Sequence, residues 1–441
     1  MMTKQVTHFP KNDNGNGWSL MLEPRSPKPA LVGEHEVDWL VIGAGYAGLG
    51  AARRFAENRP NERVILLEAH EAGENASGRN SGFAIDLPHV IGGGKDELEG
   101  SHRYMALARA AIEYHETQIE KYGIDCDWAK RGKYQTASSD RGIGELLEPF
   151  AREMEALGET YTWLDKAECD KQLGTRHFKA AVYTPGCILL NPAALVRGLA
   201  DNLPENVTLC ENSPVISIDH TGGIRVTTPG GEVRAKRLFL GVNAFAEKFG
   251  YYQRRLLPCA ANASLSRQLT PEEQKQMGSV ENWGVTPSNA FVSVTMRYTR
   301  DHRILMRNNI YYNPEMRETD RFLQKIRAQH QRLFEERFPM LPDVDMEYTW
   351  TGYVCLSHNG SPGFGEIADN VYASVCQNAI GVTKGTVGGM LAADMACGVD
   401  NELIGFMQSL GDPNKMPPRP VLDLGVRSRM AWELYKNRHE A

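Results

Sequence analysis

The pattern of apolar and polar residues near the start of the chain predicts, in order, a strand, a turn, a helix and a second strand. Residues 37–42 (VDWLVI) are mainly apolar, which is typical of a buried parallel strand. They run into the glycine-rich stretch 43–48 (GAGYAG), and residues 49–56 then follow with the spacing of a helix. A second apolar run, residues 63–67 (RVILL), ends at Glu68. The pattern predicts a β-α-β unit with a glycine-rich turn between its first strand and its helix.

The three glycines of this turn have the spacing G-x-G-x-x-G, which is typical of dinucleotide binding. Gly43 permits a tight turn, Gly45 lets the backbone approach a pyrophosphate, and Gly48 lets helix and strand pack closely. Phosphates would bind the free amides at the helix N-terminus, and Glu68 is placed to accept hydrogen bonds from a ribose diol. The candidate contacts are Gly43, Gly45, Tyr46, Ala47, Gly48, Glu68 and Ala69.

Further elements follow from periodicity and from glycine and proline stops. The alternating runs 290–294 and 303–306 indicate antiparallel strands with one covered face, and the proline at 192 is typical of a helix start. Additional strands are predicted over residues 132–136, 207–210, 215–218, 224–228, 233–240 and 371–375. Helices are predicted over residues 102–122, 142–157, 318–338 and 426–437, with His102 and His115 interpreted as surface or core histidines.

Composition excludes several classes of protein. The chain has 441 residues, 41% of them hydrophobic, which is enough for two lobes with cores of their own. A net charge of −6 gives no electrostatic reason to expect nucleic acid as a partner. The eight cysteines form no C-x-x-C pair, which argues against a zinc module or a disulfide framework and favours a cytoplasmic location. We expect no metal, no membrane-spanning helix and no signal peptide. Residues 1–36 are predicted to be an extended leader on the surface, with Trp18 and the run Leu20, Met21 and Leu22 as its anchors.

A run of small residues, 72–83 (AGENASGRNSGF), follows the dinucleotide strands. Together, GAGYAGL, Glu68 and ASGRNSG resemble the glycine oxidase / D-amino-acid dehydrogenase (DAO) superfamily of FAD-dependent amine oxidoreductases. Within it, the chain is most similar to the gamma-glutamylputrescine oxidoreductase-like branch, over about residues 16–438. The resemblance implies FAD contacts at Ser77, Gly78, Arg79, Asn80, Ser81, Gly82, Val215, Asn243, Gly381, Val382, Thr383 and Lys384.

The resemblance also implies a mixed α/β fold, in which a Rossmann-like FAD-binding domain carries a second, antiparallel-sheet substrate domain. The implied domains are the leader (1–36), a discontinuous FAD-binding domain (37–254 and 349–412), the substrate domain (255–348) and a C-terminal helical extension (413–441). Part of residues 83–200 is a candidate contribution to the substrate lobe. In the family, the glycine-rich helix that starts at Gly381 points its N-terminus at the flavin pyrimidine edge.

The implied reaction is oxidation of a C–N bond in a small amine or amino acid, with hydride transfer to flavin N5 and hydrolysis of the imine product. Oxygen is the expected electron acceptor, giving hydrogen peroxide. An arginine or a lysine would bind a substrate carboxylate, and the candidates are Arg307, after a predicted strand, and Lys384, beside the flavin. The cysteine that holds flavin covalently in sarcosine oxidases aligns with Gly352 rather than Cys355, so non-covalent FAD is expected.

Three alternatives stay open on the sequence alone. The first is an FAD-dependent dehydrogenase that passes electrons to a quinone. The second is an NAD(P)-dependent dehydrogenase that uses the same glycine turn, which leaves the ASGRNSG run unexplained. The third is a flavin-binding assembly or tRNA-modification partner without enzymatic activity, which would favour a basic surface. The identity of the amine and the oligomeric state are not determined by the sequence.

Overall fold

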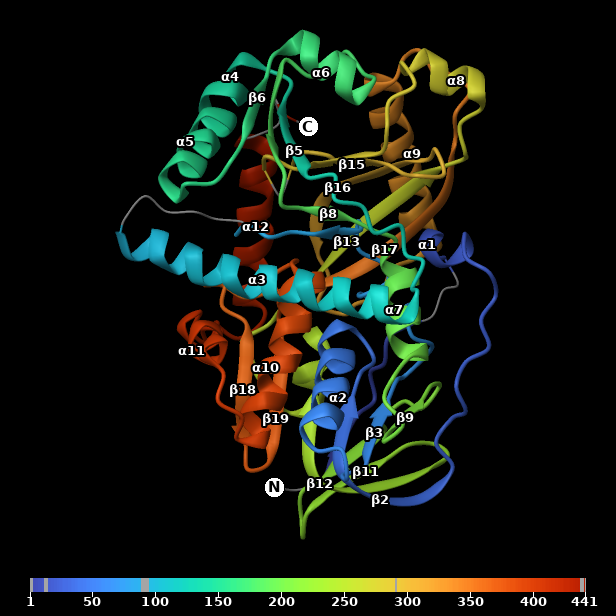
Figure 1. The fold of residues 1–441 in the computed structure, drawn as a ribbon, viewed down its shortest axis with the longest axis vertical. Coiled ribbons are helices and arrows are strands. Elements are labelled where there is room, and N and C mark those ends of the chain that lie inside the picture. Colours follow the sequence, from blue (N-terminus) through green and yellow to red (C-terminus); the bar gives the residue numbers. More distant parts are fainter. Residues whose placement is uncertain (1–2, 12–14, 89–94, 290–291, 437–439, 441) are drawn as a thin grey trace.

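Two large β-sheets organise the chain, one toward each end of its long axis, with α3 (Lys95–Tyr122) running between them (Figure 1). The computed structural model describes residues 3–11, 15–88, 95–289, 292–436 and 440. The sheets and the helices between them confirm the mixed α/β fold class that the sequence predicts.

The first sheet has the strand order β1-β10-β11-β12-β2-β3-β9, and β19 joins it by pairing with β12 and β18. Strands β2, β3, β9, β12 and β19 run parallel to one another, which explains the continuous apolar runs. The strands are β1 (Lys4–Gln5), β2 (Gly33–Ile42), β3 (Val64–Leu67), β9 (Val207–Cys210), β10 (Ser217–Asp219), β11 (Ile224–Thr227), β12 (Gly231–Leu240), β18 (Gly363–Ala368) and β19 (Val371–Val375).

Helices α2 (Tyr46–Asn58) and α10 (Thr386–Cys397) pack closely against each other beside this sheet (Figure 1). A Cβ atom added at Gly389 would overlap the carbonyl oxygen of Ala47, and one added at Gly50 would lie 2.9 Å from the oxygen of Thr386. Glycines therefore allow the two helices to approach at backbone distance. The chain that builds this part of the protein comes from both ends of the sequence.

The second sheet has the order β17-β13-β16-β15-β14-β5-β7-β6 and is antiparallel except for the β14–β5 pair. Helix α9 (Asp320–Arg337) covers one face of it, with Ile326 and Phe334 buried. The strands are β5 (Lys133–Ala137), β6 (Thr162–Leu164), β7 (Ala180–Thr184), β13 (Leu257–Ser266), β14 (Trp283–Thr286), β15 (Thr295–Tyr298), β16 (Ile304–Tyr312) and β17 (Met346–Leu356). The boundaries of the predicted domains stay predictions, although residues 133–184 contribute three strands to this sheet.

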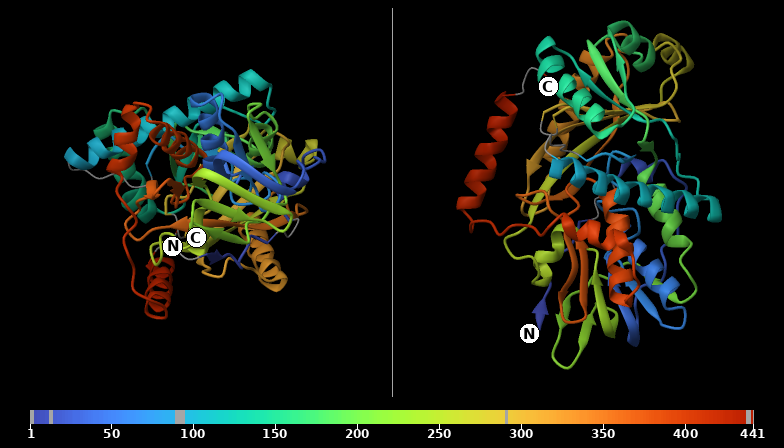
Figure 2. Two further views of the ribbon diagram at one scale, coloured as in Figure 1. Left: turned by 90° about the horizontal axis from the view of Figure 1, so that it is seen from below. Right: turned by 60° about the vertical axis from the view of Figure 1, so that its left-hand side comes forward.

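The remaining elements connect and flank the two sheets. Strands β4 (Phe83–Ala84) and β8 (Ile188–Leu189) form a separate two-stranded sheet. In the sequence, each of them lies where the chain passes from one large sheet to the other. Helix α12 runs along the outside of the molecule (Figure 2, right) and buries none of its described side chains. The other helices are α1 (Gly17–Leu20), α4 (Asp140–Gly142), α5 (Glu148–Leu157), α6 (Lys166–Leu173), α7 (Pro192–Asp201), α8 (Pro271–Gln276), α11 (Glu402–Ser409) and α12 (Val421–Lys436). Three short helical turns are not α-helical: Ile143–Leu147 and Gly381–Gly385 are π-helical, and Asn243–Phe249 is a 3₁₀ turn.

Most predicted elements are confirmed with shifted ends. β19 has the predicted bounds, α9 begins after the Thr319 cap, and α7 starts at Pro192 as predicted. The predicted strand 290–294 is wrong where the structure describes it, since the amides of Val292 and Ser293 donate to the carbonyl of Asn289 in a turn before β15. Residues 290–291 lie outside the described residues. Within the described part of the chain, no helix is long and apolar enough to cross a membrane.

Candidate cofactor and substrate site

The glycine turn after β2 has the conformation that its spacing predicts. Gly43 has a φ of +97°, which favours glycine, and its amide donates to the carbonyl of Leu67 over 2.7 Å. A Cβ atom at Gly48 would overlap the carbonyl oxygen of Gly43, so only glycine lets α2 pack this closely on the turn. The tight turn and the close packing predicted for these two residues are confirmed.

Gly45 precedes α2 and lies against the loop that follows β3. A Cβ atom at Gly45 would lie 2.6 Å from the Oγ of Ser77. The same Oγ accepts a hydrogen bond of 3.1 Å from the amide of Tyr46, the first residue of α2. Ser77 therefore lies at the N-terminus of the helix, where the helix dipole would stabilise an anion.

A cavity with about 990 Å³ of space, part of it open to solvent, lies beside this turn. Asn243 lines it, and the side-chain oxygen of Asn243 is buried without a hydrogen-bond partner among the described residues. The structure brings seven of the predicted cofactor residues together on the cavity wall: Gly43, Gly45, Glu68, Ala69, Ser77, Val215 and Asn243.

Glu68 ends the second parallel strand and reaches this cavity with a buried carboxylate. Its Oε2 accepts from the amide of Ala44 over 2.7 Å, and its Oε1 accepts from the amide of His70 and the Nδ2 of Asn75. Burial raises the pKa of Glu68, and these three donors oppose the shift. The carboxylate thus ties the turn after β2 to the loop after β3.

The predicted loop residues 78–82 connect the two sheets. Arg79 donates to the carbonyls of Glu74 (2.6 Å) and Thr351 (3.2 Å), and its own carbonyl accepts from the indole of Trp350 over 3.0 Å. The Nδ2 of Asn80 donates to the carbonyl of Ser77 over 2.7 Å. These contacts hold the loop between the glycine turn and β17.

Arg297, on β15 of the second sheet, binds the last residues of the same loop. Its Nη1 donates to the carbonyls of Ser81 and Gly82, and Gly82 has a φ of +74°. The Arg297 side chain is buried, and burial lowers its pKa to about 10. Sequence reasoning did not find Arg297, because its partners are the backbone carbonyls of Ser81, Gly82 and Leu190, which lie 216, 215 and 107 residues away.

Residues of the predicted leader also hold this loop. The Nδ2 of Asn16, which is fully buried, lies 3.1 Å from each of the carbonyl oxygens of Gly73 and Gly78. The indole of Trp18, buried as the sequence predicts, donates to the carbonyl of Asn80 over 2.8 Å. Met21 and Leu22 pack partly buried beside it, whereas Leu20 is exposed, so its prediction as an anchor is wrong. No sequence signal marks Asn16, since a lone asparagine in an irregular segment has many possible partners.

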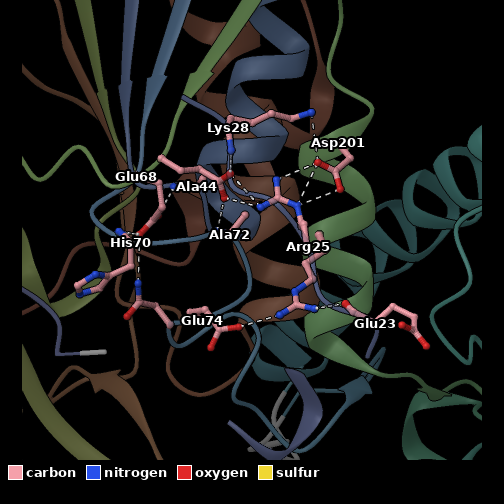
Figure 3. A network of polar contacts seen from close by, with 12 residues as sticks. Glu23, Arg25, Lys28, Ala44, Glu68, His70, Ala72, Glu74 and Asp201 are labelled. Atoms are coloured by element: carbon pink, nitrogen blue, oxygen red, sulfur yellow. Dashed lines mark hydrogen bonds and ion pairs between the residues drawn. The ribbon is translucent and has the colours of Figure 1, made fainter. Parts of the chain in front are cut away.

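A charged network supports the loop from outside (Figure 3). Arg25 pairs with Asp201 and with the fully buried carboxylate of Glu211, each over 2.8 Å. Glu211 in turn accepts from the amide of Ala72 over 2.6 Å. The leader, the loop after β3 and the end of β9 are therefore joined by one buried set of contacts.

The predicted flavin-facing turn begins with a π-helical segment, Gly381–Gly385, and the α-helix α10 starts only at Thr386. His115 on α3 contacts this turn, with its Nε2 2.9 Å from the Oγ1 of Thr386 and 3.2 Å from the carbonyl of Val382. His115 is fully buried, and burial lowers its pKa to about 4. It is a neutral core histidine, as predicted, and it positions the turn.

Lys384 lies in this turn with a buried side chain. Its ammonium nitrogen lies 5.9 Å from the centre of the Tyr104 ring, and none of the described residues forms a hydrogen bond or an ion pair with it. Burial lowers the pKa of Lys384 to about 8. A buried ammonium group without an acidic partner is typical of a functional site.

Arg307 lies on the face of the second sheet that packs toward the first. It is opposite Thr295, and its neighbour Leu305 is opposite Arg297, so these side chains share one face. Arg307 is 9% exposed, and burial lowers its pKa to about 10. Its hydrogen bond to Thr295 is long, 3.5 Å from Nη1 to Oγ1, and no described acidic residue pairs with it.

These features define a dinucleotide-binding protein. Arg307 on its second sheet, the roof sheet, and Lys384 before α10 are buried cations without an acidic partner among the described residues. Residues 38–395 match the family model of FAD dependent oxidoreductases, known as DAO, and the chain belongs to this family. FAD, rather than a nicotinamide nucleotide, is therefore its cofactor. The resemblance stated from the GAGYAGL and ASGRNSG motifs is confirmed.

Two curated relatives and one solved structure illustrate the likeness. A probable oxidoreductase, OrdL, of Haemophilus influenzae is 26% identical over 419 residues, which are 90% of this chain and 91% of the relative. The gamma-glutamylputrescine oxidoreductase of Escherichia coli is 27% identical over 372 residues, 82% of this chain and 84% of that enzyme. The crystal structure of glycine oxidase from Geobacillus kaustophilus superposes with a TM-score of 0.72 at 17% identity, covering 87% of this chain and all of that one, which shows a shared fold.

The residues present fit FAD. The N-terminus of α2 lies at the cavity wall, where the helix dipole would favour a pyrophosphate. Glu68 and the side-chain oxygen of Asn243, which has no partner among the described residues, offer acceptors on the same wall. Glycine at position 45 leaves room beside Ser77 that a side chain would fill. The individual contacts of the predicted cofactor residues stay predictions.

Proposed function

We propose that this chain oxidises the C–N bond of a small amine or amino acid that carries a carboxylate. The observation that carries the proposal is Arg307, a buried guanidinium without an acidic partner on the face of the roof sheet that packs toward the cofactor domain. A buried cation of this kind is stabilised by an anionic ligand. The names of the relatives support the class, since glycine and gamma-glutamylputrescine both contain an amine and a carboxylate.

The protein's own residues bind and orient the substrate. Arg307 binds the carboxylate in a bidentate geometry, and Lys384 supplies a second positive charge in a buried environment. Both charges favour the neutral amine over the ammonium form, and the neutral amine is the form that gives up a hydride. No nucleophilic side chain is required.

FAD, when bound, supplies the oxidising power: it takes two electrons and a proton from the C–H bond beside nitrogen. The substrate nitrogen loses one proton, which leaves an imine that water hydrolyses to a carbonyl compound and a free amine. We propose oxygen as the electron acceptor, which gives hydrogen peroxide.

The eight cysteines are free buried thiols, which supports the predicted location in the reducing cytoplasm.

The visible spectrum of the purified protein tests this proposal. Under anaerobic conditions, the flavin bands are expected to bleach when one member of a panel of amino acids and N-substituted glycines is added. Admitting oxygen should restore the bands quickly and release one peroxide per turnover, whereas a quinone-dependent enzyme would recover only slowly in oxygen and quickly when a soluble quinone is added. A flavin that no amine of the panel bleaches would contradict the proposed reaction.

Arg307→Ala is expected to raise KM for the bleaching substrate by about 10-fold to 100-fold, because a charge-assisted hydrogen bond contributes about 1.5–3 kcal/mol. The turnover number kcat should fall by much less, since this contact is made equally before and during the reaction. Steady-state kinetics give both values. Arg300→Ala is the matched control, because Arg300 is exposed and pairs only with surface carboxylates. Unchanged kinetics in Arg307→Ala would show that this arginine does not bind substrate.

A further inference from the structure

The first described residues of the chain form a strap, defined as residues 4–10, along the edge of the first sheet. β1 pairs antiparallel with β10, so that Lys4 lies opposite Ile218, and the amide of Val6 donates to the carbonyl of Ile216 over 2.9 Å. The Val6 side chain is buried in the same apolar cluster as Val215 and Ile218. The strap is therefore fixed to the sheet and is not a free tail.

The second half of the strap forms a wall of the cofactor cavity. His8, Phe9 and Pro10 line the cavity together with the glycine turn. The His8 ring lies 6.0 Å from the ring of Phe245, which also lines the cavity. Burial is the largest of the effects that lower the pKa of His8, so its ring is neutral near pH 7.

The strap is also connected to Glu68. The Nε2 of His70 donates to the carbonyl of Pro10 over 2.7 Å, and the amide of His70 donates to the Oε1 of Glu68 over 3.2 Å. One short chain of hydrogen bonds thus links the strap to the acid that ends β3. A shift of the strap would disturb the cavity on two sides.

We infer that the strap is part of the FAD site and retains the bound cofactor. It lies outside residues 38–395, the part of the chain that matches the family, and outside the dinucleotide motif itself. Its apolar and aromatic side chains exclude water from one side of the cavity, and they must separate from a bound dinucleotide before it leaves. The inference rests on FAD as the cofactor and makes no use of the proposed substrate.

The test measures FAD dissociation from the full-length holoenzyme and from two variants. Deletion of residues 1–10 removes the strap, and His8→Ala/Phe9→Ala removes two wall side chains while β1 stays in place. We expect the dissociation constant of FAD to rise at least 10-fold in both, through faster release, as followed by the fluorescence of free flavin after dilution. For His8→Ala/Phe9→Ala, the melting temperature should fall more in the FAD-loaded protein than in the FAD-free one. The deletion also removes the buried Val6 and the pairing of β1, so its melting temperature should fall in both forms.

Lys4→Ala/Gln5→Ala is the matched control, because both side chains lie in the strap and are exposed. It should release FAD at the wild-type rate. The inference would be overturned if His8→Ala/Phe9→Ala bound FAD with wild-type affinity and release rate, or if the FAD-free and FAD-loaded melting temperatures fell equally. No substrate is present in this assay, so a protein that keeps FAD normally but reacts with no amine contradicts only the proposed function.

Discussion

Gly45→Val is expected to give a folded protein that contains no FAD. A Cβ atom at this position lies 2.6 Å from the Oγ of Ser77, and the two further methyl groups of valine would extend toward the cavity and the start of α2. The hydroxyl of Ser77 would have to leave the amide of Tyr46. Since the site loses both its space and a helix-terminus contact, we expect FAD affinity to fall by about 100-fold or more, about 3 kcal/mol.

The measurement is the flavin absorbance of the purified variant before and after incubation with excess FAD. Gly144→Val is the matched control, because a Cβ atom at Gly144 has open space around it and the residue is exposed. This control should keep a full complement of flavin. Gly48→Val is unsuitable, since a Cβ atom there overlaps the carbonyl of Gly43 and would disturb the fold itself. Normal flavin content in Gly45→Val would remove the pyrophosphate assignment.

Lys384→Met is expected to stabilise the FAD-free protein while it weakens substrate binding. Burial lowers the pKa of Lys384 from 10.5 to about 8, so the folded chain binds this proton less tightly than the unfolded chain. The cost of burying the ammonium is complete below pH 8 and disappears as the pH rises toward 10.5. Removing the charge should therefore raise the free energy of unfolding at pH 7 by about 3 kcal/mol, and the gain should vanish near pH 10.5.

Urea denaturation of the FAD-free proteins at pH 7 and pH 10 measures this difference. Lys130→Met is the matched control, because the Lys130 side chain is 70% exposed and only contacts Glu116 at the surface. Its effect should stay within about 0.5 kcal/mol at both pH values. A Lys384→Met protein that is less stable than wild type at pH 7 would show that the ammonium has a stabilising partner. If Lys384 binds substrate as proposed, KM should rise in turnover because one of the two proposed substrate-binding cations is lost.

The sequence predicts those parts of the site whose interacting residues lie close together in the chain. Gly43, Gly45 and Gly48 act on the backbone within one turn of each other, so their spacing alone indicates what they do. Glu68 is found in the same way, because it ends the next strand of the same unit. The prediction of a strand at 290–294 is wrong because the carbonyl of Asn289 accepts hydrogen bonds from the amides of Val292 and Ser293. This turn prevails over the local alternation of apolar and polar residues.

Asn16 and Arg297, which the sequence did not predict, bind groups that are far away in the sequence. Asn16 bonds to carbonyls 57 and 62 residues away, and Arg297 reaches a carbonyl 215 residues away. Their partners are backbone groups, which every residue carries, so no pairing of residue types marks them. Arg307 and Lys384 were predicted because a substrate carboxylate requires a cation, and these two follow a predicted strand and open the predicted flavin-facing helix. In the structure, Arg307 lies within β16 rather than after a strand. Their roles stay predictions until the kinetics are measured.

The close packing of α2 against α10 has a consequence for biosynthesis. A nascent chain acquires its glycine turn within the first fifty residues, but β19 and α10 leave the ribosome only after residue 397 has been added. Until then, the first sheet lacks β19, and the face of α2 that approaches Thr386 and Gly389 is uncovered. We therefore expect cofactor capture to be a late event of synthesis, because the FAD contacts predicted in the turn Gly381–Gly385 follow β19 in the chain. A chain truncated before β19 would carry the whole nucleotide motif without these predicted contacts.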